Sequence, residues 1–355
     1  NDIIMAFWTL GLVVAMWRYL EEGKQRYLYV AAVLLALAFA TKETAYLVTM
    51  TLGGYLALAL LIESWPKVRP NIVLGQVSPP VALWRLGTSI VTAAYRLPQA
   101  TRGSRGLDFL TLLFTLTLPM GAAAVSLFQD TALLRWTHIV LAAPVDGGGP
   151  IGSPVAGGTA VAVYAVLLLA LFSAYVGYRW NWKVYWRSAL VFYAIIAVLY
   201  TTFFTNMSGL GSGVWQSLGY WVVQQGEARG AQPWYYYFLI GSVYEFVALL
   251  FGLAGVVYYS RRRDPFGLFL AFWAVATFIL YMVASEKMPW LLVNVALPLI
   301  VLAARLIGEL ADRTRWRSLA ANGGLLVAPG VLLFVVLLYT LAFSQFDNAI
   351  DGLVA

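Results

Sequence analysis

The chain has 355 residues, of which 61% are hydrophobic and 11% are charged, and its net charge is +7. Soluble domains carry roughly 25% charged residues, so this composition excludes an ordinary soluble protein and indicates an integral membrane protein. The chain has no cysteine and one histidine, His138, which excludes disulfides, cysteine-ligated metals and a histidine-rich metal site.

Ten apolar segments follow one another along the sequence, and the longer ones suffice to cross a bilayer core of roughly 30 Å. We therefore predict an all-α membrane domain of about ten transmembrane helices. The first segment is short and no Met precedes it, so we expect the natural chain to continue upstream of Asn1. The predicted segments are Ile3–Trp17, Tyr27–Ala40, Thr44–Ile62, Phe109–Leu127, Thr159–Val176, Ala189–Phe204, Tyr236–Tyr259, Gly267–Ala284, Trp290–Ala304 and Gly324–Phe343.

The distribution of basic residues indicates on which side of the membrane each connection between these segments lies. All but four of the 23 lysines and arginines fall in alternate connections, which the positive-inside rule places on the inner side. This predicts a multi-pass protein of the cell membrane with both visible ends outside. The short spans on either side of Thr41–Glu43 also fit a re-entrant hairpin. The four outer cations are Lys42, Arg135, Arg229 and Lys287.

The long inner loop, residues 64–108, carries an apolar stripe at helical spacing. Trp84, Val91 and Leu97 belong to this stripe, with Arg85 and Arg96 on the other side. The pattern favours an amphipathic helix on the inner membrane surface, in contact with anionic lipids. A solvated loop with a chance stripe is the alternative.

Two outer segments differ in character. Residues 146–158 are rich in Gly and Pro and indicate a loop, without the Gly-Lys-Ser/Thr ending of a nucleotide-binding loop. Residues 205–235 combine aromatic rings with amides and one acid–base pair, which suits a sugar or a lipid headgroup. An interfacial helix with an aromatic belt is the alternative. Nucleic acid is disfavoured because no basic extramembrane domain is visible. The polar residues there are Gln216, Gln224, Gln225, Glu227, Arg229 and Gln232.

Two adjacent acid–base pairs lie at the predicted outer ends of spans, where ionised groups are costly unless they are paired or functional. Lys42-Glu43 forms the first pair, and Glu286-Lys287 the second. A salt-bridged turn is the simpler interpretation of each. The alternative is that both pairs project into one outer cavity.

Further polar and aromatic residues lie near the same predicted face. Asp2 is either a helix N-cap or a functional carboxylate. Glu245 lies inside the predicted span that begins at Tyr236. Its carboxylate is either paired with a group on another helix or functional. Pro289 and Trp290 suit the first turn of a helix at the membrane interface.

Four stretches carry a resemblance to a known family: residues 40–46 (ATKETAY), 220–225 (YWVVQQ), 229–237 (RGAQPWYYY) and 286–290 (EKMPW). They resemble the prokaryotic membrane proteins described as flippase-activity-associated. These are similar to the GT-C glycosyltransferases, which include protein O-mannosyltransferases and aminoarabinose transferases.

The resemblance implies a GT-C-like helical bundle that transfers a sugar from a polyprenyl-phosphate donor. The acceptor would be a protein, lipid or glycan on the outer face. Such enzymes carry a catalytic carboxylate in a first outer loop, which would precede Asn1, and Asp2 resembles a second acidic position. No cofactor is implied with certainty, and a divalent metal at Asp2 stays open.

The candidate residues follow from this hypothesis. A carboxylate would deprotonate the acceptor, and cations would hold the departing phosphate. The candidate catalytic residues are Asp2, Glu43 and Glu286. The candidate substrate-binding residues are Lys42, Gln224, Gln225, Glu227, Arg229, Gln232, Trp234, Tyr235, Glu245, Lys287 and Trp290. Two other functions fit the same pattern, a flippase or transporter of lipid-linked sugars and a non-catalytic subunit of an envelope assembly.

Overall fold

The computed structural model is helical, and in the residues that it describes the only strand-like feature is an isolated bridge between Val140 and Val155. The described residues are 1–68, 101, 103–129, 131, 137–145, 150–155, 157–225, 232–285, 287–315, 318, 326–327 and 329–340.

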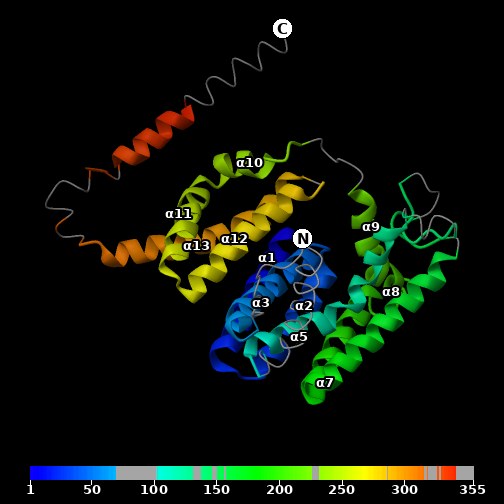
Figure 1. Cartoon of the computed structure of the whole chain (residues 1–355). Helices are drawn as coiled ribbons and strands as arrows, with labels where there is room; N and C mark the ends of the chain where they lie inside the picture. Colours follow the sequence, from blue (N-terminus) through cyan, green and yellow to red (C-terminus); the bar gives the residue numbers. More distant parts are fainter. Residues whose placement is uncertain are drawn as a thin grey trace, which may run out of the picture. The chain divides into compact units, whose positions relative to one another are not determined.

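Two compact units divide the chain, residues 1–303 and residues 304–355. In the first unit, α1, α2, α3 and α5 form a bundle against which α7 packs, and α12 packs on α3 and α11 (Figure 1). The second unit contains the end of α13 and the helix Pro329–Thr340. The elements are α1 (Asp2–Glu22), α2 (Arg26–Thr41), α3 (Ala45–Val68), α5 (Arg105–Thr117), η1 (Pro119–Phe128), α7 (Gly158–Tyr200), α8 (Gly209–Gly211), η2 (Ser212–Gln216), α9 (Ser217–Gln224), α10 (Tyr236–Tyr244), α11 (Phe246–Arg262), α12 (Pro265–Val283), η3 (Pro289–Leu291) and α13 (Leu292–Arg313).

Within the described residues, five helices are long and apolar enough to cross a membrane, or up to seven if two bent pairs each count as one span. This confirms the all-helical membrane architecture, whereas the full number of ten spans stays a prediction. The predicted inner surface helix around Val91 lies outside the described residues.

Two segments that the sequence predicted as single spans are sharply bent. The segment Phe109–Leu127 is α5 followed by the 3₁₀ helix η1, with an angle of 69° between them. Pro119 explains this bend, because proline has no backbone N–H to donate and its ring clashes with the preceding turn of the helix. The segment Tyr236–Tyr259 is broken at Glu245 into α10 and α11, which lie at 114°.

Side chains from neighbouring helices satisfy carbonyls at the C-terminal ends of two helices, α1 and α2. Arg105 donates to the carbonyls of Leu20 and Glu21 in α1, over 2.9 and 2.5 Å. The Tyr200 hydroxyl donates to the carbonyl of Phe39 in α2 over 3.0 Å. The last carbonyls of a helix have no partner within it, and an unsatisfied group is costly in a bilayer. These contacts therefore fix where the helices end relative to one another.

α7 contains a break at Asn181, whose φ is −158° and ψ is 95°, and therefore consists of two helices. On either side of it, Ser173 donates to the carbonyl of Thr115, and Tyr193 donates to the carbonyl of Leu116 over 3.0 Å. Because both halves reach neighbouring carbonyls of α5, α7 folds back as a helical hairpin. This agrees with the two predicted spans, Thr159–Val176 and Ala189–Phe204, except that the second helix ends at Tyr200.

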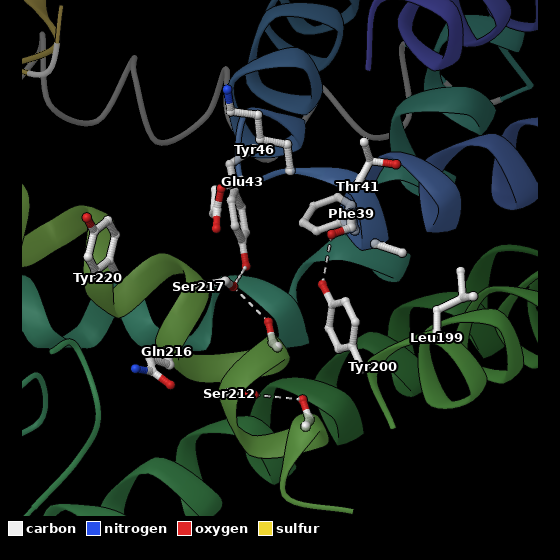
Figure 2. Close-up of a pocket in the computed structure, with 14 residues that line it drawn as sticks. Phe39, Thr41, Glu43, Tyr46, Leu199, Tyr200, Ser212, Gln216, Ser217 and Tyr220 are labelled. Atoms are coloured by element: carbon white, nitrogen blue, oxygen red, sulfur yellow. Dashed lines mark hydrogen bonds between the residues drawn. The ribbon is translucent and has the colours of Figure 1, made fainter. Parts of the chain in front are cut away.

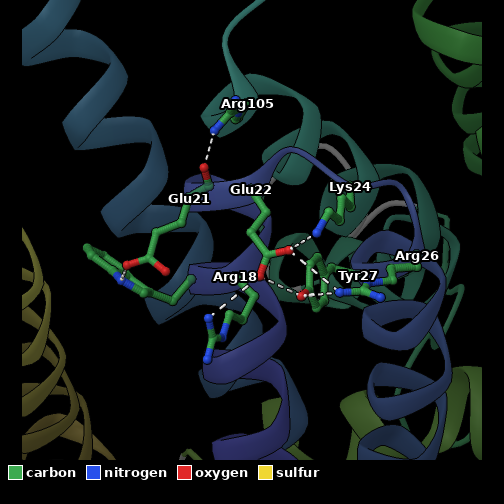
Figure 3. A network of polar contacts seen from close by, with 8 residues as sticks. Arg18, Glu21, Glu22, Lys24, Arg26, Tyr27 and Arg105 are labelled. Atoms are coloured by element: carbon green, nitrogen blue, oxygen red, sulfur yellow. Dashed lines mark hydrogen bonds and ion pairs between the residues drawn. The ribbon is translucent and has the colours of Figure 1, made fainter.

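A polar network surrounds Glu22 at the C-terminal end of α1 (Figure 3). Lys24 Nζ lies 2.6 Å from its carboxylate, and Arg18 and Arg26 each lie 3.6 Å from it. The Tyr27 hydroxyl donates to the same carboxylate over 2.8 Å. The cations gather at the end predicted to lie inside, as the positive-inside rule expects.

Candidate functional site

The turn between α2 and α3 holds the first predicted acid–base pair. α2 ends at Thr41 and α3 begins at Ala45, so Lys42 and Glu43 occupy a connection of three residues. Lys42 Nζ lies 2.6 Å from Asp2 Oδ1, and the two side chains are 21% and 17% exposed. The structure thus brings together two predicted site residues, Asp2 and Lys42, as a largely buried ion pair.

Glu43 lines a cavity of about 520 Å³ between this turn and the helix of residues 209–224 (Figure 2). Within the described part of the chain, the Glu43 carboxylate has neither a hydrogen bond nor an ion pair. Because its neighbour Lys42 is engaged with Asp2, Glu43 remains available to a ligand. The lining also includes Thr41, Lys42, Tyr46, Tyr200, Ser212, Gln216, Ser217 and Tyr220.

The helix on the far side of the cavity presents one polar face. Ser212, Gln216 and Tyr220 recur every four residues, which places them on the same side of a helix. Gln216 donates through Nε2 to the carbonyl of Ile151 over 3.0 Å, and this contact anchors the helix to the segment that contains Ile151. Figure 2 shows Glu43 across from the helix that carries Gln216 and Tyr220.

Tyrosine hydroxyls bind the walls of the cavity together. The Tyr46 hydroxyl donates to the carbonyl of Met120 over 2.9 Å and lies 3.3 Å from Ser217 Oγ. Tyr200, through its bond to Phe39, joins α7 to α2. Hydrogen bonds therefore connect five elements around the cavity: α2, α3, η1, α7 and α9.

A tight turn after α7 brings the polar helix back over the cavity. Thr202, Phe203 and Phe204 have φ values of 51°, 57° and 66°, a left-handed conformation that bulky residues rarely adopt. The Thr201 hydroxyl accepts the Phe204 N–H over 2.9 Å and stabilises the turn. The sequence predicted a loop over residues 205–235, whereas residues 209–224 are helical.

The second predicted acid–base pair has a different environment. Lys287 is buried and donates to the carbonyl of Ala284 over 2.7 Å, whereas Glu286 lies outside the described residues. The preceding Ser285 hydroxyl donates to the carbonyl of Gln225 over 2.8 Å. The structure thus joins Gln225 to this segment, although neither Gln225 nor Lys287 lines the cavity that contains Glu43.

The other predicted residues are dispersed. Gln224 is buried with its Oε1 unpartnered. Trp234 and Tyr235 are exposed and lie edge to face at 5.6 Å, and Gln232 and Trp290 are also exposed. Tyr236 and Tyr237, which follow in sequence, belong instead to a core cluster with Tyr281. Glu227 and Arg229 lie outside the described residues.

The sequence predicted that Glu245 lies inside a single membrane span, but the structure places it at a break in that segment. It occupies the corner between α10 and α11 with φ −128° and ψ 36°. Its side chain is half-buried and has no polar partner among the described residues. The described residues contain no group of three or more His, Asp or Glu side chains placed to hold a metal ion.

Sequence reasoning missed several residues that line the cavity. Ser212, Ser217 and Tyr200 were not among the candidates, while Gln216 and Tyr220 were noted only as part of an aromatic stretch. The four-residue spacing of Ser212, Gln216 and Tyr220 was the available signal. Comparisons with protein-family models, with curated proteins and with solved structures found no match.

Proposed function

We propose that this chain is a membrane glycosyltransferase that moves a sugar from a polyprenyl-phosphate donor to an acceptor hydroxyl, in the cavity that contains Glu43. The observation that carries the proposal is an unpaired carboxylate facing hydroxyls and an amide in a cavity of about 520 Å³. This volume lies within the range of small-molecule sites, roughly 300–1,000 Å³. The cell membrane, with this cavity on the outer side, is the location that the proposal assigns.

In the proposed reaction, the acceptor oxygen attacks the anomeric carbon while the bond from that carbon to the phosphate oxygen breaks. Glu43 takes the acceptor proton as a general base, and the electron pair of the broken bond leaves on the polyprenyl phosphate. A single displacement inverts the configuration at the anomeric carbon. The acceptor is a protein, lipid or glycan.

Lys42 is the cation nearest to Glu43 in the chain, and it is suited to stabilise charge on the leaving phosphate. It would do so by sharing its ammonium between Asp2 and the phosphate, since the ammonium carries three donors. Gln216, Ser212 and Tyr220 supply donors and acceptors for sugar hydroxyls. Their arrangement opposite Glu43 supports binding of the sugar between the two walls (Figure 2).

The test is transfer of a radiolabelled sugar from polyprenyl phosphate by the full-length protein in proteoliposomes, with cell-envelope acceptors. Glu43→Gln keeps the size of the side chain but removes the base, so we expect transfer to fall by about 10²–10⁴-fold. Glu21→Gln is the matched control, since Glu21 is exposed at the other end of α1 and its amide still accepts from Trp17. Unchanged transfer in Glu43→Gln, with Glu21→Gln also active, would remove Glu43 from the mechanism.

One observation favours a second function, translocation of a lipid-linked sugar. Transporters bind substrates where membrane helices are broken, and this chain bends by 69° between α5 and η1 and by 114° between α10 and α11. The same proteoliposomes distinguish the two functions. Movement of the labelled lipid across the bilayer without a covalent product would support translocation, whereas a covalent product would support transfer.

A further inference from the structure

A second cavity, of about 720 Å³, lies between α3, α11 and α12, away from the Glu43 cavity. Its walls are apolar along most of their length, with Ala59 from α3, Val256 from α11 and Ile279 from α12 among the lining residues. We call it the α3–α12 groove. None of its lining residues borders the cavity that contains Glu43.

The α3–α12 groove is as long as one leaflet of a bilayer. On α12 it extends from Pro265 to Ile279, a helical rise of about 21 Å at 1.5 Å per residue. A bilayer is roughly 40–45 Å thick with its headgroups, so one leaflet measures about 20–22 Å. A groove of this length and apolar character fits an acyl chain lying parallel to α12.

Only one end of the groove is polar. Glu63 and Ser260 line it there, and the arginines at positions 261–263 directly follow Ser260. Near the middle of the groove Tyr55 and Phe272 pack together, with ring centroids 5.6 Å apart, and beyond them α12 contributes the apolar residues Val275, Ala276 and Ile279. The polarity of the groove thus matches that of a lipid, with the headgroup at the end of Glu63.

The charges at this end have both signs. Glu63 forms no hydrogen bond or ion pair in the described part of the chain, and the same holds for the exposed Arg261 and Arg263. A carboxylate in the groove wall, with arginines one and three residues beyond the lining Ser260, complements a headgroup that carries both a phosphate and an ammonium. Arginine is suited to phosphate, and an ammonium with three N–H donors is suited to a carboxylate.

We propose that the α3–α12 groove is a binding site for phosphatidylethanolamine. One acyl chain lies along α12, the phosphate contacts Arg261 and Arg263, and the ammonium donates to Glu63. A quaternary choline headgroup has no N–H to donate, and a glycerol headgroup has no cation for Glu63. The site is separate from the proposed sugar transfer, and its test requires no enzymatic activity.

The experiment measures lipids that stay bound to the full-length protein. The protein is reconstituted with equal amounts of phosphatidylethanolamine, phosphatidylglycerol and phosphatidylcholine, extracted in detergent and analysed by native mass spectrometry. We expect phosphatidylethanolamine to be retained above the other two. In Glu63→Gln its preference over phosphatidylglycerol should fall about tenfold, the effect of losing one charge-assisted hydrogen bond.

Two further variants test the phosphate contact and the acyl-chain contact one at a time. Arg263→Gln removes a contact to the phosphate that all three lipids carry, so it should weaken retention of each without affecting packing, because Arg263 is exposed. Ala276→Phe fills the groove and should reduce retention of all three lipids. The matched controls are Asp312→Asn, an exposed carboxylate elsewhere, and Leu171→Phe, an exposed position on α7. Both controls should behave as the unaltered protein does.

Equal retention of the three lipids would overturn the proposal, because it would mean ordinary surrounding lipid. A preference for phosphatidylglycerol that persists in Glu63→Gln would also overturn it, since the arginines alone would then select the headgroup. Thermal unfolding of every variant is measured alongside. If Ala276→Phe does not fold, Glu63→Gln and Arg263→Gln still decide the outcome.

Discussion

Lys42 and Asp2 are forty residues apart in the chain, yet Lys42 Nζ lies 2.6 Å from Asp2 Oδ1. The contact ties the first turn of α1 to the end of α2 and occupies the cation next to Glu43. Both residues of the pair were predicted as site residues. Their mutual contact gives each side chain a partner of opposite formal charge at a largely buried position, where an unpaired ion would be costly.

The ion pair between Asp2 and Lys42 should contribute measurably to stability. We expect Asp2→Asn and Lys42→Met each to lower the free energy of unfolding, with a coupling energy of about 0.5–3 kcal/mol in a double-mutant cycle. The Arg18–Glu22 pair serves as the control, because its atoms lie 3.6 Å apart and Arg18 is 57% exposed. Exposed helical pairs couple by about 0.3–0.5 kcal/mol. Equal coupling of the two pairs would contradict the expectation.

The close approach of Gly152 and Gly219 should not tolerate a side chain. A Cβ on Gly219 would lie 2.2 Å from the Gly152 carbonyl oxygen, and a Cβ on Gly152 would lie 2.2 Å from the Tyr220 nitrogen. Gly152 also has φ +77°, where alanine is strained. Since backbone must move, we expect Gly152→Ala and Gly219→Ala each to cost about 1–3 kcal/mol or more, seen as a lower melting temperature.

Gly211→Ala is the matched control for the glycine variants, because it lies in the same run of helix with open space around its Cβ. There the substitution should leave stability unchanged or raise it, since alanine favours helix by about 1 kcal/mol over glycine. Similar destabilisation in all three variants would indicate that the helix, and not the glycine contact, is sensitive.

Asp108 should require both of its carboxylate oxygens. Oδ2 accepts from the Tyr19 hydroxyl over 2.8 Å, and Oδ1 accepts from Trp180 Nε1 over 2.7 Å. Asparagine offers one oxygen, so Asp108→Asn leaves one donor unsatisfied and should cost about 1–3 kcal/mol, measured by chemical unfolding. In Glu21→Gln, where one oxygen accepts from Trp17, the loss should be smaller. If both variants lose the same stability, the two-oxygen explanation fails.

The sequence predicts helices best where local chemistry marks their ends. α12 begins at Pro265 with Asp264 as its cap, which accepts the Gly267 N–H over 2.6 Å, and the apolar run starting near there was predicted correctly. The bend at Pro119 had a local signal, the proline itself, but the continuous apolar run around it led to the prediction of a single span. The break at Glu245 has no proline beside it and depends on packing between distant segments, which composition cannot show.

The candidate site was also predictable only where the local sequence carried a signal. Glu43 and Lys42 stood out because charges between two apolar runs are rare. Ser212 and Ser217 reach the cavity because the chain reverses at residues 202–204 in a left-handed conformation. The residue pattern did not predict that reversal, since threonine and phenylalanine rarely adopt a left-handed backbone conformation.

The break of α7 at Asn181 has a consequence for how the protein enters the membrane. Its two halves are joined by a turn flanked by Arg179 and Lys183, which resists passage through the bilayer. We therefore expect the two halves to insert as a pair, with this turn staying on the side of synthesis. Their acceptors, the carbonyls of Thr115 and Leu116, belong to a helix translated earlier, so the docking surface precedes the hairpin that it receives.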